Sequence, residues 1–264
     1  MDWTGPMVEA MSAAKPILFM SQRLWHNERV DMENLRGKNI LVLGGSGALG
    51  SLLTSKLSAA GAQVMATTTT NDRGTHIPSV ASPRLLLDLE RPDSIDVLVN
   101  YLIQSNAQID GIVNATGVVA FGPASEISLA TLAKLTAVNF TGPVAVISGL
   151  LPALKKSAAA GNEPFIVNIS GVVAESPMAG LAAYSASKAG LWAFDQALAR
   201  EVRKDGIRVI DARPGHTETG LATRAIAGSS PAFPTGMTPE SVGERIVAAI
   251  LGGESDLPST AFAK

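Results

Sequence analysis

The chain has 264 residues, of which 46% are hydrophobic and 17% charged, and its net charge is −2. This length fits one large domain or two small ones, and the composition is that of a chain with a sizeable buried core. No basic run marks a nucleic-acid partner. The chain has no cysteine, which excludes disulfides, thiol catalysis and thiolate metal sites.

The sequence predicts neither a metal site nor a membrane segment. His26, His76 and His216 are scattered without metal-ligand spacing, and no apolar run reaches the roughly 18 residues of a membrane span. The short apolar run at 17–20 is followed at once by polar residues, so we expect no signal peptide. We therefore expect a cytoplasmic protein.

Residues 1–36 show weak periodicity and are expected to form an N-terminal extension ahead of a domain at 37–264. That domain opens with a buried strand at 39–43, a glycine turn at 44–50 and a helix that Gly61 closes. Gly45, Gly47 and Gly50 satisfy G-x-G-x-x-G, and Gly44 provides a second reading of the motif. Glycines allow a pyrophosphate to approach the backbone, and the helix N-terminus offers it free N–H groups.

The second strand, at 62–67, leads into a run of threonines. NAD-selective folds place an acidic residue near this strand end to bind the ribose 2′-hydroxyl. This chain has Thr67, Thr68 and two further threonines there, followed closely by Arg73. Hydroxyls and a guanidinium can bind a 2′-phosphate, and no carboxylate at the strand end repels it. The run therefore favours NADP(H), with NAD(H) possible.

The rest of the chain alternates strands with helices. Strands are predicted at 84–88, 109–113, 164–170 and 207–210, a last helix at 239–251 and an edge strand near 257–262. The helical region from about 125 is either broken at Gly142-Pro143 or restarted there. Residues 216–238 are rich in Gly, Ser, Thr and Pro and are expected to form a substrate lid. This order predicts an α/β fold, a doubly wound parallel sheet (Rossmann fold) in a single domain.

Tyr184 and Lys188 stand four residues apart in a helical run without proline, so they should project from one face of one helix. An ammonium one turn from a phenol favours the ionised phenol and lowers its pKa. The pair is therefore a candidate for proton transfer near neutral pH.

Four motifs in order give the chain a resemblance to the short-chain dehydrogenase/reductase family over about residues 38–251. They are the glycine turn, the Asn114-Ala115-Thr116-Gly117 segment, the Tyr184/Lys188 pair and the Pro214-Gly215 pair. The resemblance implies that Tyr184 moves the proton, that Lys188 tunes it and binds the nicotinamide ribose, and that Asn139 holds a relay water. Asp88 would contact the adenine, and Thr219 the carboxamide. The resemblance extends cofactor binding to Gly44, Ser46, Gly47, Leu49, Gly50, Thr67, Thr68, Arg73, Asp88, Leu89, Asn114, Ala115, Gly117, Tyr184, Lys188, Pro214, Gly215, Thr217 and Thr219.

One departure from the family pattern affects the catalytic centre. The family's catalytic serine precedes the tyrosine by thirteen residues, and that position holds Gly171 here. Ser170, one place earlier, is the catalytic candidate if the loop shifts by one residue. The alternatives are that Ser176 substitutes or that the hydrogen bond is missing, which costs on the order of 10²–10³ in rate.

The resemblance implies an NADP(H)-dependent carbonyl reductase or secondary alcohol dehydrogenase that acts on a small carbonyl or alcohol and assembles as a homodimer or homotetramer. Gly171 motivates an alternative, an NADP-binding sensor or complex subunit with little turnover. A sugar-nucleotide epimerase shares two of the motifs, but this chain has no room for the larger substrate domain of such enzymes.

Overall fold

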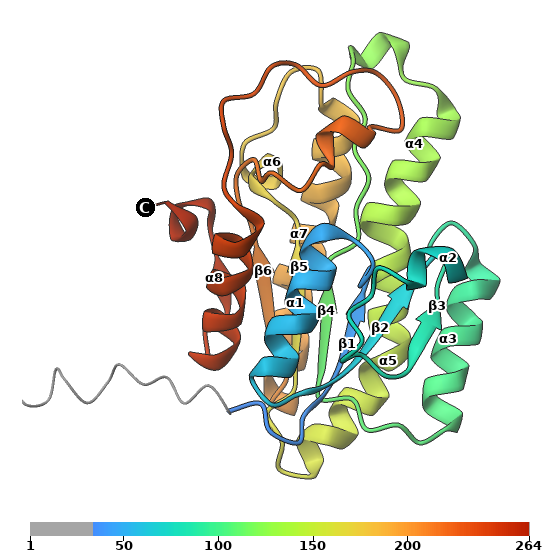
Figure 1. The fold of residues 1–264 in the computed structure, drawn as a ribbon, viewed down its shortest axis with the longest axis vertical. Coiled ribbons are helices and arrows are strands. Elements are labelled where there is room, and N and C mark those ends of the chain that lie inside the picture. The colour runs from blue at the N-terminus through green and yellow to red at the C-terminus, as the bar shows by residue number, and fades with distance from the viewer. Residues whose placement is uncertain (1–33, 264) are drawn as a thin grey trace, which may run out of the picture. The chain divides into compact units, whose positions relative to one another are not determined.

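Residues 34–263 are described in a computed structural model of the protein (Figure 1). They form one α/β domain around a seven-stranded, all-parallel sheet of order β3-β2-β1-β4-β5-β6-β7. The strands are β1 (Asn39–Leu43), β2 (Gln63–Thr68), β3 (Arg84–Leu86), β4 (Gly111–Asn114), β5 (Phe165–Ile169), β6 (Arg208–Ala212) and β7 (Asp256–Leu257). The helices are α1 (Ala48–Ala59), α2 (Asn71–Gly74), α3 (Pro92–Gln104), α4 (Leu129–Thr136), α5 (Gly142–Ala159), α6 (Val172–Glu175), α7 (Ala182–Val202) and α8 (Pro239–Leu251). The predicted doubly wound fold is confirmed.

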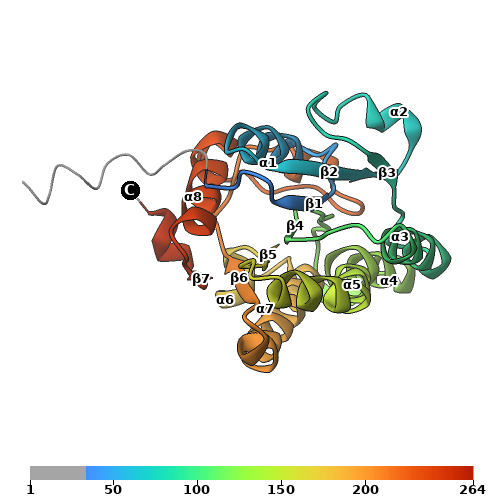
Figure 2. The same cartoon turned by 90° about the horizontal axis from the view of Figure 1, so that it is seen from below.

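Alternate residues of each central strand pack to opposite sides of the sheet. In β1, Ile40 and Val42 join a core with α1 and α8, whereas Leu41 and Leu43 join a core with α3, α5 and α7. Figure 2 shows these helices covering the two faces. Because both faces are covered, the strands read as continuous apolar runs, which is why the sequence predicts them well.

One boundary prediction needs correction. The expected edge strand near 257–262 is a two-residue strand, β7, followed by a short 3₁₀ turn at Ser259–Phe262. Of the two alternatives at Gly142-Pro143, the structure shows the restart: a π-turn at Ala137–Thr141 follows α4, and α5 begins at Gly142. Pro143 has no N–H for the Asn139 carbonyl four residues back, and the wider turn accommodates this loss. Residues 1–33 of the expected N-terminal extension lie outside the described residues. Leu35 is already part of the core beside α1.

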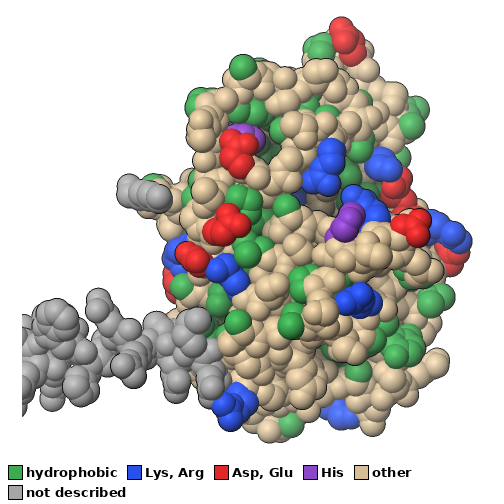
Figure 3. All heavy atoms as spheres, in the orientation of Figure 1, with side chains coloured by type: hydrophobic (Ala, Val, Ile, Leu, Met, Phe, Trp, Pro, Cys, Tyr) green, Lys and Arg blue, Asp and Glu red, His purple; other side chains and the backbone are tan. Residues whose placement is uncertain are grey.

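The joined helix Leu129–Ala159 has a mean hydropathy of 1.5 and is, by length and composition, the one helix among residues 34–263 that passes as a membrane span. In the domain it packs on the sheet, with Val146, Ile147 and Leu150 fully buried. A core helix has the same composition, so these properties alone assign no membrane. On the face drawn in Figure 3, charged side chains of both signs are scattered.

The burial of this helix makes a stability prediction. Leu150→Ala removes a fully buried side chain and is expected to lower the free energy of unfolding by about 2–5 kcal/mol. Leu129→Ala, on the same helix, removes a side chain that is 85% exposed and should change it by less than about 0.5 kcal/mol. Urea unfolding of both variants measures the difference. Equal losses would contradict the packing described here.

Candidate active site

A cavity of ≈ 240 Å³ lies at the carboxyl ends of the central strands. In an open parallel sheet, ligands bind outside these ends, where the strand order reverses, here between β1 and β4. The cavity brings together many of the residues predicted from the sequence. They are Gly47, Leu49, Ala115, Gly117, Ser170, Tyr184, Lys188, Pro214, Gly215, Thr217 and Thr219.

The glycine turn between β1 and α1 is held by close backbone packing. A Cβ on Gly50 would lie 2.1 Å from the Gly44 carbonyl oxygen, so only glycine fits at this position. The Gly44 N–H donates to the Thr67 hydroxyl (3.1 Å) and the Gly47 N–H to the Gly44 carbonyl (2.9 Å). Gly47 caps α1 without a side-chain hydrogen bond. The turn therefore leaves the N-terminus of α1 open to an anion.

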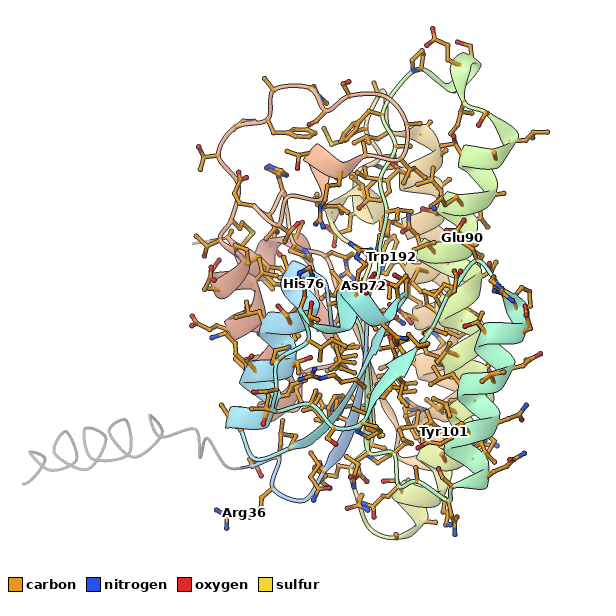
Figure 4. All side chains as sticks on the ribbon, turned by 45° about the vertical axis from the view of Figure 1, so that its right-hand side comes forward. Arg36, Asp72, His76, Glu90, Tyr101 and Trp192 are labelled. Carbon is orange, nitrogen blue, oxygen red and sulfur yellow. The ribbon has the colours of Figure 1, made fainter. Side chains whose placement is uncertain are left out.

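Some residues of the threonine run support the glycine turn, and others lie exposed to solvent. Thr67 is buried and supports Gly44, while the Thr68 hydroxyl donates to Ser46 Oγ (3.2 Å). Thr70 caps α2 by accepting from the Arg73 N–H. The Arg73 side chain is exposed. Asp72, on α2, and His76, in the loop that follows, come from this same segment after β2 (Figure 4). Thr67 thus shapes the turn, and Arg73 is the cation that remains accessible to a ligand.

Three other predicted residues lie after β3 and at the end of β4. Asp88 follows β3, and its carboxylate accepts from the Glu90 N–H (3.0 Å). Leu89 is buried in the core beside α3 and α5, so it contributes through its backbone or not at all. Asn114, at the end of β4, accepts from the Thr116 N–H (3.1 Å) and hydroxyl (2.5 Å) and so holds the floor of the cavity in place.

The proton-transfer pair lies on the first turns of α7. Lys188 is almost fully buried, and its ammonium donates to the Ile169 carbonyl at the end of β5 (2.8 Å). Burial lowers the pKa of Lys188 to about 8, against an opposing effect of Asp211. Burial also raises the pKa of Tyr184 to about 12. The expected lowering of the phenol pKa by Lys188 is therefore outweighed by desolvation, and the phenol stays protonated at neutral pH.

Asn139 lies in the π-turn and is fully buried. Its amide donates to the Val118 carbonyl (2.9 Å) and Ser187 Oγ (3.0 Å), and its oxygen accepts from the Val118 N–H (2.8 Å). All of its side-chain atoms are thus committed to structure. A Cβ on Gly117 would lie 3.5 Å from Lys188 Nζ and 3.6 Å from Asn139 Oδ1, which are ordinary contact distances, so both side chains border this position.

The loop after β5 determines where the Ser170 hydroxyl points. Ser170 is fully buried, and its hydroxyl donates to Asp211 Oδ1 (2.7 Å). The Ser170 and Gly171 N–H groups both bond the Ala212 carbonyl, which turns Gly171 to φ 83° and ψ 163°. With its hydroxyl bonded to Asp211, Ser170 does not present that hydroxyl to the cavity. The prediction that Ser170 holds the substrate gains no support from this geometry.

The segment 216–238 forms part of the cavity wall and contains two isolated bridges, one to the segment after β4 and one between its own two ends. Ala227 forms a bridge to Ala120, and Met237 forms one to Thr217. A Cβ on Gly228 would lie 1.9 Å from the Phe121 carbonyl, and one on Gly236 would lie 2.5 Å from the His216 carbonyl, so both ties require glycine. This segment arches over the carboxyl ends of the strands at the top of Figure 1.

Apolar side chains dominate the outer wall of the cavity. The residues Phe121, Met178, Leu181, Leu221 and Phe233 all line it. The sequence did not single out Val119, Val172 or His216. The His216 ring stacks on Phe233 at 4.9 Å. Its position directly after Pro214-Gly215 is the signal that could have found it.

Within the described residues, no group of three or more His, Asp or Glu side chains is placed to hold a metal ion.

A model of the family described as "short chain dehydrogenase" matches residues 38–229. The chain belongs to the short-chain dehydrogenase/reductase family. It is 28% identical over 262 residues to "Dehydrogenase/reductase SDR family protein 7-like" of Anopheles gambiae, covering 92% of this chain and 81% of that protein. It is 32% identical over 183 residues to "Uncharacterized oxidoreductase YbbO" of Escherichia coli K12, covering 69% and 66%.

Solved structures of this family share the fold. A 3-ketoacyl-(acyl-carrier-protein) reductase from Brucella melitensis complexed with NADH superposes with a TM-score of 0.74 at 21% identity, over 86% of this chain and 99% of that one. A short-chain dehydrogenase from Burkholderia cenocepacia in complex with NADP gives a TM-score of 0.71 at 21% identity, over 85% and 88%. The protein is thus an NAD(P)-dependent oxidoreductase of the short-chain dehydrogenase/reductase family.

Gly171 gives a testable prediction. Its φ and ψ lie in a region that only glycine adopts readily, so Gly171→Ser is expected to cost about 1–3 kcal/mol of unfolding free energy. Ala179→Ser, at an exposed position of the same loop, should change it by less than about 0.5 kcal/mol. Urea unfolding compares the two. A Gly171→Ser protein as stable as the parent would show that the loop does not require this conformation.

Proposed function

We propose that this short-chain dehydrogenase is an NADP(H)-dependent carbonyl reductase or secondary alcohol dehydrogenase, with Tyr184 as its proton donor and acceptor. The observation that carries the proposal is that Tyr184, Lys188 and the glycine turn border one apolar-walled cavity. A cofactor and a small carbonyl compound can therefore meet beside a phenol.

The residues of the turn fit a dinucleotide phosphate. Gly50 permits close backbone approach, and α1 offers unbonded N–H groups at its start. No carboxylate stands at the end of β2, and Arg73 is exposed just beyond it. When bound, a nicotinamide cofactor supplies the hydride chemistry. The chain itself supplies the phosphate cradle and the cation that favours a 2′-phosphate.

The chain's own groups support the direction of reduction. The raised pKa of Tyr184 keeps its phenol protonated at neutral pH, which is the form that donates a proton to a developing alkoxide. Lys188, fixed by the Ile169 carbonyl, provides positive charge one helical turn away. Asn139 braces the segment after β4 against α7 and so fixes the distance between the cavity floor and the pair.

A second candidate function remains, NADP binding with little turnover. It is favoured by one observation. Among the described residues that line the cavity, Ser170 is the one serine and its hydroxyl is bonded to Asp211, while position 171 is glycine and Ser176 does not line the cavity. A panel of ketones, aldehydes and secondary alcohols separates the two functions. Turnover supports the reductase, and tight NADPH binding without oxidation supports the second candidate.

Tyr184→Phe tests the proton-transfer role. It removes the hydroxyl while keeping the ring, so kcat/KM for the best carbonyl substrate is expected to fall by about 10²–10⁴, with NADPH affinity unchanged. Tyr101→Phe is the matched control, since Tyr101 lies 51% exposed on α3. Steady-state kinetics and NADPH fluorescence titration provide the two readouts. Full activity of Tyr184→Phe would refute the mechanism.

Arg73→Ala tests cofactor preference. The loss of a charge-assisted contact should weaken NADPH binding by about tenfold and leave NADH binding unaltered. Arg200→Ala, at an exposed position far along α7, controls for the change in net charge. Titration of each protein with both cofactors measures the effect. Equal NADH and NADPH affinity in the parent protein would overturn the assignment of NADP.

A further inference from the structure

A row of polar side chains crosses the sheet just below the cavity. Asn114, Asn168 and Asp211 occupy the same register position on β4, β5 and β6. All three are buried, and neighbouring strand positions place them on the face covered by α7. Asp195 of α7 completes the row from above, because Asn168 Nδ2 donates to Asp195 Oδ1 (2.6 Å). Two carboxyl groups thus meet in the core.

Each of the two carboxyl groups has one oxygen that accepts no hydrogen bond. Asp211 Oδ1 accepts from Ser170 Oγ (2.7 Å) and from Arg213 Nη1 (2.7 Å). Asp195 Oδ2 and Asp211 Oδ2 are both buried without another partner. Asn168, which donates to Asp195, is the strand neighbour of Asp211, so the two carboxyl groups lie on either side of one amide. A buried carboxylate oxygen beside another is strongly unfavourable unless a proton lies between them.

We propose that Asp195 and Asp211 share a single proton, and that the charge this leaves on Asp211 holds Lys188 protonated beside Tyr184. The donors decide where the charge resides. Asp211 receives a guanidinium and a hydroxyl, whereas Asp195 receives one neutral amide. Charge is more stable on the acid with the cationic donor, so Asp195 carries the proton and donates it to Asp211.

The surrounding charges fit this distribution. Arg213 is buried, pairs with Asp211, Glu175 and Asp256, and lies over the Trp192 ring at 5.2 Å. Trp192, labelled in Figure 4, comes from α7, as Asp195 and Lys188 do. Burial raises the pKa of Asp195 well above its ordinary value, with Asp211 adding to the effect. Arg213 is shared by Asp211, Glu175 and Asp256, so it leaves little positive charge to offset a second charged carboxylate at this depth.

Asp211 also acts on Lys188. The Lys188 ammonium donates to the Ile169 carbonyl, and the next residue, Ser170, donates its hydroxyl to Asp211, so the Asp211 carboxylate lies near the ammonium. Its negative charge opposes the lowering of the Lys188 pKa by burial. Neither Asp195 nor Asp211 lines the cavity, so both are positioning residues. The effect of Asp211 on catalysis rests on the proposed function, since it requires that Lys188 serve Tyr184. The shared proton itself does not depend on that function, so the two parts are tested separately.

Asp195→Asn tests the shared proton, because an amide replaces the protonated acid at nearly equal size. A carboxyl whose folded pKa is raised gives stability that is complete below the unfolded pKa of about 3.9 and is lost as pH rises through the folded pKa. Between the unfolded-state and folded-state pKa values of Asp195, the equilibrium constant for unfolding of the parent should rise about tenfold per pH unit relative to that of Asp195→Asn. Urea unfolding at pH 5 to 9 measures this ratio. A ratio independent of pH would overturn the shared proton.

The pH dependence of the rate tests the link to Lys188. At saturating cofactor, kcat is expected to decrease at alkaline pH as Lys188 loses its proton. Asp211→Asn should lower the pH midpoint of this decrease by at least about one unit. Asp195→Asn keeps the charge on Asp211 and should leave that fall in place. An unchanged midpoint in Asp211→Asn, or a shifted midpoint in Asp195→Asn, would overturn the proposed effect of Asp211 on Lys188.

Two outcomes separate this proposal from the proposed function. If Asp211→Asn does not fold, the pH profile of Asp195→Asn still decides the link, because a shift there contradicts it. If the protein turns over no carbonyl substrate, the proposed function and the link to Lys188 both fail. The stability ratio of Asp195→Asn then still supports or refutes the shared proton alone.

Discussion

The ion pair between Arg213 and Asp211 is the interaction on which the active-site end of the sheet depends. One guanidinium joins the end of β6 to Glu175 of α6, to Asp256 of β7 and, through its stacking, to Trp192 of α7. A buried ion pair adds little net stability compared with apolar packing, but breaking it is costly. Its contribution is therefore geometric, since α6, α7 and the Pro214-Gly215 segment can take only one arrangement around it.

The same ion pair explains the unusual loop after β5. Asp211 draws the Ser170 hydroxyl inward, and the two successive N–H groups of Ser170 and Gly171 then share one carbonyl. The backbone must turn through a conformation open to glycine at the next position. The inward Ser170 hydroxyl and the positive φ of Gly171 are thus both linked to the end of β6.

The fold and part of the site could be predicted from the sequence because their signals are local. Strand, glycine turn and helix follow one another within residues 39–59, and Tyr184 and Lys188 are one helical turn apart. The π-turn was missed because Pro143 also permits a break, and only packing against the sheet decides between them. The direction of the Ser170 hydroxyl was out of reach, since its partner Asp211 lies on another strand. One local signal was overlooked, the carboxylate of Asp195 between Leu191 and Leu198 on the buried stripe of α7.

The two glycine ties of the segment over the cavity bear on how this protein can diversify. Gly228 and Gly236 are fixed by backbone carbonyls of Phe121 and His216, which belong to the cavity wall. The stretch between them, 229–235, is mostly exposed and reaches the cavity through Phe233. Its residues can vary while Gly228 and Gly236 hold its two ends in place. Evolution or design can alter the shape of the substrate entrance there, while the proton-transfer groups and the phosphate cradle remain undisturbed.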